Sequence, residues 1–125
     1  MIRYTPITDI VELKKLYDFN EDDNIIYGGY IGLDENDIQI GKCLVSINNF
    51  SCEILKLDCD FEDKLLVEGF IRSALNFCAN RNAFIASCKI EKVKDVLLLL
   101  GFENVDGTYK GEIPSLLKGC CGCQK

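Results

Sequence analysis

One segment constrains the fold of this chain more than any other. Between residues 63 and 80, apolar side chains recur at four-residue steps in two adjacent rows: Leu66, Phe70, Ala74 and Cys78, beside Val67, Ile71 and Leu75. This period predicts a strongly amphipathic helix with one buried face. Strand-like apolar runs precede it at 51–59 and follow it at 83–88. A strand, a helix and a strand in this order predict a parallel strand pair joined by a crossover helix.

The remaining segments add strands and helices around this unit. Asp9 followed by Glu12 is typical of a helix start, so a helix is expected over 9–17. Gly101 suits the left-handed end of another helix, over 91–100. Further strands are expected at 2–7 (stopping near Pro6), 25–33, 38–47 and 105–113, the last interrupted by a turn at Asp106-Gly107. Consecutive strands early in the chain favour antiparallel pairing.

Two strands carry more detailed predictions. The apolar alternation of 38–47 changes phase around Gly41, which predicts a β-bulge there. In 51–59, strict alternation places Leu55, Leu57 and Cys59 on one face, and Ile54, Lys56 and Asp58 on the other. Together the elements predict an α/β fold of the α+β type. Its sheet is mixed, mostly antiparallel and twisted, with about six strands flanked by three to four helices.

Length and charge limit the classes of protein that this chain can represent. With 125 residues, the chain suits one domain, placed at 1–113, followed by a cysteine-rich tail at 114–125. A net charge of −6 disfavours nucleic acid as a partner. No apolar run approaches the ~20 residues of a membrane helix, and the first residues lack the features of a signal peptide. A cytoplasmic protein without membrane contact is expected.

The eight cysteines fall into two groups. Five lie within apolar periodic segments, where a reduced cysteine behaves as a small hydrophobic residue, and these are expected in the core: Cys43, Cys52, Cys59, Cys78 and Cys88. The other three, Cys120, Cys121 and Cys123, lie together near the C-terminus, outside any core pattern. Packing alone does not explain this second group.

Two short segments accompany the predicted order of elements. The first, at the start of the central helix, is Lys64-Leu65-Leu66-Val67-Glu68-Gly69, and the second is Leu97-Leu98-Leu99-Leu100-Gly101-Phe102. The order of elements resembles the GCN5-related N-acetyltransferase (GNAT) fold over nearly all of 1–113. Gly69 matches the last position of the family's [Q/R]-x-x-G-x-[G/A] loop, Lys64 is a basic substitute at the first, and Gly101-Phe102 matches the Gly-Phe ending of a later family segment.

The resemblance implies a site for acetyl-CoA. In the family, backbone amides at the start of the central helix hold the pyrophosphate, as expected at any helix N-terminus. The residues implied at the cofactor are Leu57 and Cys59, whose backbone would hold the pantetheine arm, and Lys64, Leu65, Val67, Glu68 and Gly69. Val67 replaces the first glycine, so a branched side chain is expected where phosphate approaches. The nearby acidic residues, Asp58, Asp60, Glu62, Asp63 and Glu68, oppose a polyanion.

The resemblance also implies catalytic residues. Glu53 corresponds to a family glutamate that takes the proton of the attacking amine, and an apolar setting would help to raise its pKa. The residues alone favour a glutamate in solvent at a strand edge. The family's tyrosine acid is replaced by Leu97 and its asparagine by Ile90, and neither side chain forms hydrogen bonds. Tyr109 is the candidate acid, with Tyr27 and Tyr30 as others, although tyrosines in strands also serve packing.

The tail allows several interpretations. Cys120 and Cys123 have C-x-x-C spacing, which suits one metal ion or one disulfide, and Cys121 would be a third ligand. A zinc site needs a fourth ligand, and the chain has no histidine. Three interpretations of the tail remain: it binds a soft metal or an iron–sulfur cluster, it does thiol redox work, or it is reduced and holds no ligand.

Two hypotheses follow for the function. The first is an acetyl-CoA-dependent N-acyltransferase acting on an unknown small-molecule or peptide amine, with a homodimer as a candidate assembly. The second is an inactive protein of this fold whose tail holds a metal ion or a partner. Without histidine, Ser-His-Asp and Cys-His catalysis are excluded, and no P-loop or dinucleotide-binding glycine loop is present.

Overall fold

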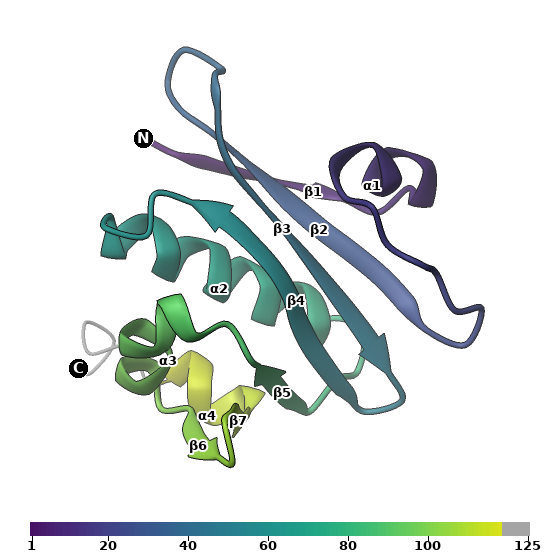
Figure 1. The fold of residues 1–125 in the computed structure, drawn as a ribbon, viewed down its shortest axis with the longest axis vertical. Coiled ribbons are helices and arrows are strands. Elements are labelled where there is room, and N and C mark those ends of the chain that lie inside the picture. The colour runs from purple at the N-terminus through teal and green to yellow at the C-terminus, as the bar shows by residue number, and fades with distance from the viewer. Residues whose placement is uncertain (119–125) are drawn as a thin grey trace.

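A computed structural model describes residues 1–118 of the chain. Within them a single sheet of seven strands is formed by β1 (Arg3–Ile7), β2 (Ile26–Leu33), β3 (Gln39–Asn48), β4 (Ser51–Cys59), β5 (Ile85–Cys88), β6 (Glu103–Val105) and β7 (Thr108–Glu112). The helices are α1 (Ile10–Leu16), α2 (Lys64–Ala79), α3 (Lys94–Leu100) and α4 (Ile113–Lys118), with a 3-10 turn, η1 (Glu91–Val93), before α3. Figure 1 shows their arrangement.

The order of strands across the sheet is β1-β2-β3-β4-β5-β7-β6. Every neighbouring pair is antiparallel except β4 and β5, which are parallel and joined through α2. This confirms the predicted fold class. The sheet has seven strands because the Asp106-Gly107 turn, with both residues at positive φ, splits the predicted last strand in two. Pro6 lies inside β1, which is an edge strand, where a missing N–H is tolerated.

The helices cover the two faces of the sheet unequally. Cys43 and Val45 of β3 belong to the main core, which α2, α3 and α4 cover. Leu44, between them, points to the opposite face and packs against Leu13 and Tyr17 in and just after α1. Since neighbouring side chains in a strand alternate, α1 and α2 lie on opposite faces (Figure 1). The face that carries α1 is therefore covered mainly over β2 and β3.

Irregular pairing occurs in β3 and in β4, the two strands whose alternation was predicted in detail. On β3, Gly32 of β2 opposes Gly41 while Leu33 opposes Gln39, so the extra residue is Ile40, next to the predicted position. On β4, Leu44 opposes Lys56 while Val45 opposes Ile54, so Leu55 is an extra residue that alternation did not reveal.

The extra residue in β4 corrects the predicted faces. Ile54 and Leu57 both belong to the main core, and Leu55 packs with the cluster under α1. The predicted grouping of Leu55 with Leu57, and of Ile54 with Lys56, is wrong because one inserted residue reverses the alternation. Lys56 and Asp58 consequently lie on the α1 side of the sheet, together with Leu55.

The predicted domain boundary falls inside a helix. Residues 113–118 form α4, whose Ile113 and Leu116 are buried in the main core. The backbone N–H of Ile113 also bonds to the carbonyl of Phe84, just before β5. The segment at 114–118 therefore packs as part of the domain.

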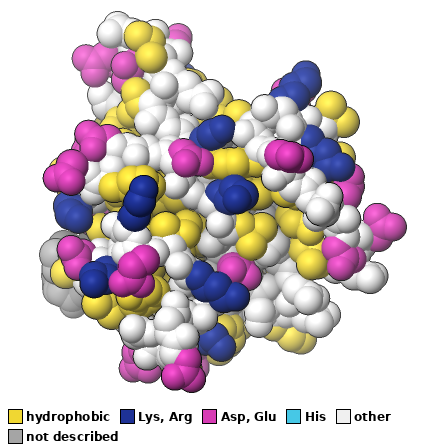
Figure 2. Space-filling model, viewed as in Figure 1, with side chains coloured by type: hydrophobic (Ala, Val, Ile, Leu, Met, Phe, Trp, Pro, Cys, Tyr) yellow, Lys and Arg dark blue, Asp and Glu magenta, His cyan; other side chains and the backbone are white. Residues whose placement is uncertain are grey.

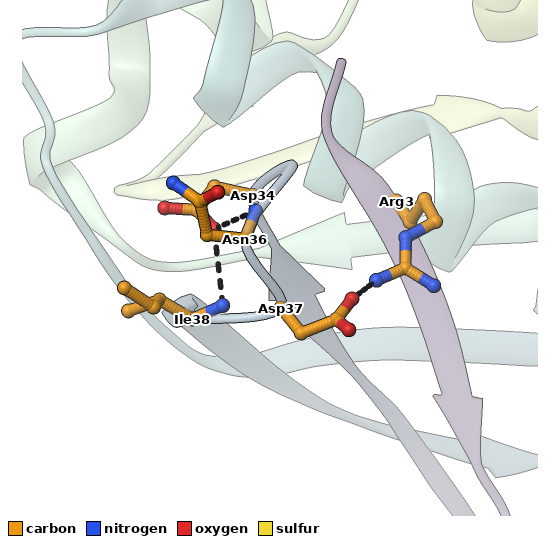
Figure 3. Close-up of polar contacts among 5 residues, drawn as sticks. All are labelled: Arg3, Asp34, Asn36, Asp37 and Ile38. Carbon is orange, nitrogen blue, oxygen red and sulfur yellow. Dashed lines mark hydrogen bonds and ion pairs between the residues drawn. The ribbon is translucent and has the colours of Figure 1, made fainter.

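The edge strand β1 is held to the tip of the β2–β3 hairpin (Figure 3). Arg3 donates to the carboxylate of Asp37, a residue with φ of 63° in the hairpin turn. Asp34 stabilises the same turn, because its carboxylate accepts from the backbone N–H groups of Asn36 and Ile38. This anchoring keeps β1, and with it Tyr4, beside α2.

Among residues 1–118, no helix is both long and apolar enough to cross a membrane.

Candidate functional site

The parallel strands β4 and β5 pair over only part of their length. Their register runs from Ser51 opposite Ile85 to Ile54 opposite Cys88, and the chain then leaves β5 toward η1. Among residues 1–118, the second half of β4, 55–59, therefore has a strand neighbour only on its β3 side, and we call it the unpaired half of β4 because its other edge has no partner strand. Figure 1 shows the two strands separating toward the start of α2. Backbone N–H and C=O groups directed toward the gap are free to bind an extended ligand.

A cleft of about 720 Å³ lies beside this half of β4. Its lining comes from the end of α1, from β3, from β4 and from the segment after β5: Leu16, Tyr17, Asp18, Lys42, Leu55, Lys56, Leu57, Asp58 and Ile90. Two lysines and two aspartates stand among apolar side chains, and Figure 2 shows such a mixture of charged and hydrophobic side chains across this side of the molecule. Small-molecule sites are usually lined mainly by apolar side chains with a few polar groups, so this cleft is more polar than most.

A hydrogen-bond network fixes one wall of the cleft. The hydroxyl oxygen of Tyr17 lies 2.8 Å from Oδ2 of Asp58 and 3.0 Å from the carbonyl oxygen of Lys42. Nζ of Lys42 donates to the carbonyl oxygen of Leu16 at 2.7 Å and lies 4.4 Å from the centre of the Tyr17 ring. Burial, followed by the bond and charge of Asp58, raises the pKa of Tyr17 far above its usual value. Tyr17 is therefore a neutral hydrogen-bond donor that orients Asp58.

The sequence analysis missed this network, although it named the strands that carry it. Lys42 and Asp58 are cross-strand neighbours on β3 and β4, a relationship that depends on the register and on the extra residue at Leu55. Tyr17 comes from the end of α1, 25 residues before Lys42 and 41 before Asp58. The available signal was the position of single charged residues within otherwise apolar strands.

The predicted catalytic residues lie outside the cleft lining. Glu53 is half-buried in β4, opposite Ser46 on one side and Ser87 on the other. The ring of Tyr109 is buried, and its hydroxyl donates to Glu91 at 3.2 Å. Loss of solvent, followed by the nearby Glu91 carboxylate, raises the pKa of Tyr109.

The other two candidate tyrosines are also engaged elsewhere. The hydroxyl of Tyr27 accepts from the backbone N–H of Asp22 at 3.2 Å, beside a loop. The ring of Tyr30 packs edge-on against Phe77, with 6.3 Å between the ring centres. Neither residue lines the cleft.

The residues implied at the cofactor have separate environments. Leu57 and Cys59 lie in the unpaired half of β4. Lys64 forms an exposed ion pair with Asp95 of α3 at 3.9 Å, and Glu68 pairs with Arg72 at 2.7 Å. Leu65 is 80% exposed at the start of α2.

The expectation for Val67 is wrong. Its side chain is only 1% exposed and belongs to the main core, so it does not point toward the loop where phosphate would approach. Gly69 has a different role from the one that the family pattern suggests. A Cβ atom at Gly69 would lie 1.9 Å from the hydroxyl oxygen of Tyr4. The missing side chain allows α2 to approach β1.

The N-terminus of α2 is capped by the chain itself. Oδ1 of Asp63 accepts from the backbone N–H of Leu66 at 3.1 Å, and the Asp63 carbonyl accepts from Val67. Before the helix, Asp60 accepts from the N–H groups of Glu62 and Asp63. A carboxylate thus occupies the position where a helix N-terminus would bind a phosphate.

The charge of this loop acts on a neighbouring thiol. Burial, followed by the charges of Asp60, Asp58 and Asp63, raises the pKa of Cys59 to about 11. The same negative charges disfavour a bound polyanion. The charges at the start of α2 therefore disfavour the pyrophosphate of acetyl-CoA, whereas the open edge of β4 after Ile54 leaves backbone groups available to its pantetheine arm.

The predicted core cysteines are confirmed as free thiols, with Cys43, Cys52, Cys78 and Cys88 buried and Cys59 half-buried. Within 1–118, no group of three or more potential ligands is arranged to hold a metal ion. The predicted metal ligands Cys120, Cys121 and Cys123 lie outside the described residues.

Comparisons with known proteins support the fold through structure alone. No family model matches the chain, and no curated protein matches its sequence. Among solved structures, the spermidine/spermine N-acetyltransferase SpeG from Vibrio cholerae is similar with a TM-score of 0.62 and 14% identity, over 96% of this chain and 98% of that one. YhhK from E. coli, a proposed N-acetyltransferase solved bound to coenzyme A, has a TM-score of 0.64 and 12% identity, over 90% and 98%.

Tetrahymena GCN5 is also similar, with a TM-score of 0.56 and 9% identity, over 89% of this chain and 96% of that one. These likenesses span nearly the whole described domain while the sequences have diverged almost completely. The chain therefore has the GCN5-related N-acetyltransferase fold, in a divergent form.

Proposed function

We propose that this chain transfers an acyl group from a thioester of the acetyl-CoA type to an amine bound in the cleft. The observation that carries the proposal is the separation of β4 from β5 after Ile54, which opens a cleft beside unpaired strand backbone. An extended pantetheine arm has amide groups that can pair with such a strand edge. This would bring the thioester carbonyl beside Lys56 and Leu57.

The transfer needs only groups that a cleft of this kind supplies. The amine nitrogen attacks the thioester carbonyl carbon, a C–N bond forms, the C–S bond breaks, and the sulfur leaves with the bonding electron pair. The nitrogen loses one proton, and the departing thiolate finally takes up one. Asp58 lines the cleft and is oriented by Tyr17, so in this proposal its carboxylate receives the amine proton. Glu53 is the alternative base.

The test is thiol release from acetyl-CoA and from S-acetylpantetheine in the presence of a panel of primary amines. We expect amine-dependent release with at least one donor. Asp58→Asn should lower the rate by a factor of about 100, the usual minimum for a positioned base, whereas Glu53→Gln should leave it nearly unchanged. The reverse pattern would assign the base to Glu53. No release and no bound thioester would reject the proposal.

A second candidate is a protein of this fold that uses no acyl donor. The Asp63 cap at the start of α2 favours it, because that carboxylate occupies the position of a phosphate. The predicted metal site at Cys120, Cys121 and Cys123 would then supply the function. Elemental analysis of anaerobically purified full-length chain, compared with a chain ending at Lys118, tests it. Equal metal content in both would reject the metal site.

A further inference from the structure

The groups at the start of α2 indicate which acyl donors the cleft can accept. This inference rests on the proposed function. The chain runs directly from β4, whose second half lines the cleft, through 60–63 into α2. A donor laid along β4 would therefore direct its distal end at the first turn of α2. The groups present at that turn decide what the distal end can be.

Among the described residues, Asp60 and Asp63 accept from four backbone N–H groups at this turn, whereas the N–H groups of Lys64 and Leu65 have no acceptor. The N–H groups of Glu62 and Asp63 bond to Asp60, at 3.0 and 3.1 Å. Those of Leu66 and Val67 bond to the side chain and the carbonyl of Asp63, each at 3.1 Å. A pyrophosphate that reached the N–H groups of Lys64 and Leu65 would lie beside the Asp63 carboxylate, which has the same charge sign and already occupies the positive end of the helix dipole.

The lysines of this region are engaged in other contacts. Lys64 pairs with Asp95 at 3.9 Å, Lys94 pairs with Glu91 at 3.4 Å, and the ammonium group of Lys92 lies 5.5 Å from the centre of the Phe61 ring. A diphosphate would therefore meet the charges of Asp60, Glu62 and Asp63, while Lys64 and Lys94 are already paired with carboxylates.

We propose that Asp63 is a specificity-determining residue that makes the cleft select thioesters lacking a nucleotide diphosphate. The donor is held by its pantetheine-like arm along 56–59 and ends before the first turn of α2. Acyl transfer proceeds as in the proposed function: the C–N bond forms, the C–S bond breaks, and the short thiol leaves and takes up a proton. The donor class is an acyl thioester of pantetheine or of a similar amide-bearing thiol.

Binding measurements on the full chain test this selection without relying on activity. The probes are acetyl-CoA and S-acetylpantetheine, which share the thioester arm and differ in the nucleotide diphosphate. The variants are Asp63→Asn, which removes the charge and keeps an amide oxygen for the cap, and Asp63→Gly, which also frees the N–H of Leu66. Asp9→Asn is the matched control, since Asp9 caps α1 in the same way, at 2.9 Å from the N–H of Val11.

If the cleft selects thioesters that lack a nucleotide diphosphate, the wild-type chain should bind S-acetylpantetheine at least as tightly as acetyl-CoA. Asp63→Asn should tighten acetyl-CoA binding about tenfold, as expected for removal of one close like charge, and Asp63→Gly should tighten it at least as much. Neither change should alter S-acetylpantetheine binding, and Asp9→Asn should alter neither probe. Thermal melts confirm that each variant is folded.

Two results would overturn the selection while leaving the proposed function intact. One is wild-type binding of acetyl-CoA that is clearly tighter than binding of S-acetylpantetheine. The other is a change at Asp63 that tightens both probes equally. If folded wild-type and variant chains bind neither probe, the proposed function fails and the selection fails with it.

Discussion

The hydroxyl oxygen of Tyr17 lies 2.8 Å from Oδ2 of Asp58 and joins the end of α1 to the unpaired half of β4. Tyr17 follows α1 and Asp58 lies in β4, and Lys42 of β3 is the cross-strand neighbour of Asp58 and accepts from the Tyr17 hydroxyl through its carbonyl. This contact gives the cleft a carboxylate of fixed orientation. It also makes the stability of the protein depend on pH.

Replacing Tyr17 with Phe should lower the free energy of unfolding by about 1 kcal/mol at neutral pH, because the part-buried hydrogen bond that its hydroxyl shares between Asp58 and Lys42 is lost. In the native state the pKa of Tyr17 is raised above its ordinary value of 10.0. Its contribution is therefore complete below pH 10 and is lost as the pH rises further, since the unfolded chain releases the proton first.

Urea unfolding of both proteins at pH ~7 and pH ~11 measures this dependence. The difference between wild type and variant should shrink at the higher pH. Tyr4, Tyr30 and Tyr109 also have raised pKa values and are present in both proteins, so they do not contribute to that difference. A difference that is constant with pH would show that the hydroxyl of Tyr17 is not held by Asp58.

Gly69→Ala should destabilise the chain by about 1–3 kcal/mol, the usual cost of inserting a methyl group into packed structure. The added Cβ would lie 1.9 Å from the hydroxyl of Tyr4, and the Tyr4 ring is held edge-on against Phe70 with 5.0 Å between ring centres. The cost should fall sharply in a Tyr4→Ala background. Equal costs in both backgrounds, measured by thermal unfolding, would contradict this explanation of the glycine.

Val67 and Leu65 lie two positions apart in α2 and offer a matched pair. Val67→Ala should cost about 1–3 kcal/mol because it leaves a cavity in the core, whereas Leu65→Ala should change stability by less than about 0.5 kcal/mol. Val67→Ala should not improve acetyl-CoA binding, because the side chain does not face the loop. Tighter acetyl-CoA binding by this variant would show that the Val67 side chain does hinder the approach of phosphate.

Cys59 reports the negative charge at the start of α2. Asp60 makes the largest charge contribution to its raised pKa of about 11, so Asp60→Asn should lower that pKa and speed alkylation at pH ~8 several-fold. Peptide mass spectrometry after brief iodoacetamide treatment separates Cys59 from the other thiols. Asp9→Asn serves as the charge control, and an unchanged rate in Asp60→Asn would argue against a strong local field.

Local patterns predicted the elements but not their cross-strand relationships. The rows from Leu66 to Cys78 sufficed for α2, and the cap at Asp9 and the stop at Gly101 followed from local chemistry. The extra residue at Leu55 was not predictable, because a bulge depends on the partner strand as well as on its own sequence. That single residue decides that Asp58 faces the cleft.

The candidate site was less predictable than the fold for the same reason. Glu53 was chosen by family position and Tyr109 as a tyrosine able to act as an acid, yet the residues that line the cleft were brought together by the register of β3 and β4. α4 was missed because the domain was expected to end at residue 113, before a cysteine-rich tail, whereas Ile113 and Leu116 are buried and α4 packs against β7 and α2. Long-range packing overrides such local signals.

The central claim is that a thioester arm binds along the unpaired half of β4. An NMR titration of the ¹⁵N-labelled chain with S-acetylpantetheine tests it most directly, because backbone amide shifts locate the bound ligand. The account predicts the largest shifts at Lys56, Leu57, Asp58 and Ile90, with little change at Lys64 and Leu65. Shifts confined to other parts of the chain, or no shifts at millimolar ligand, would contradict it.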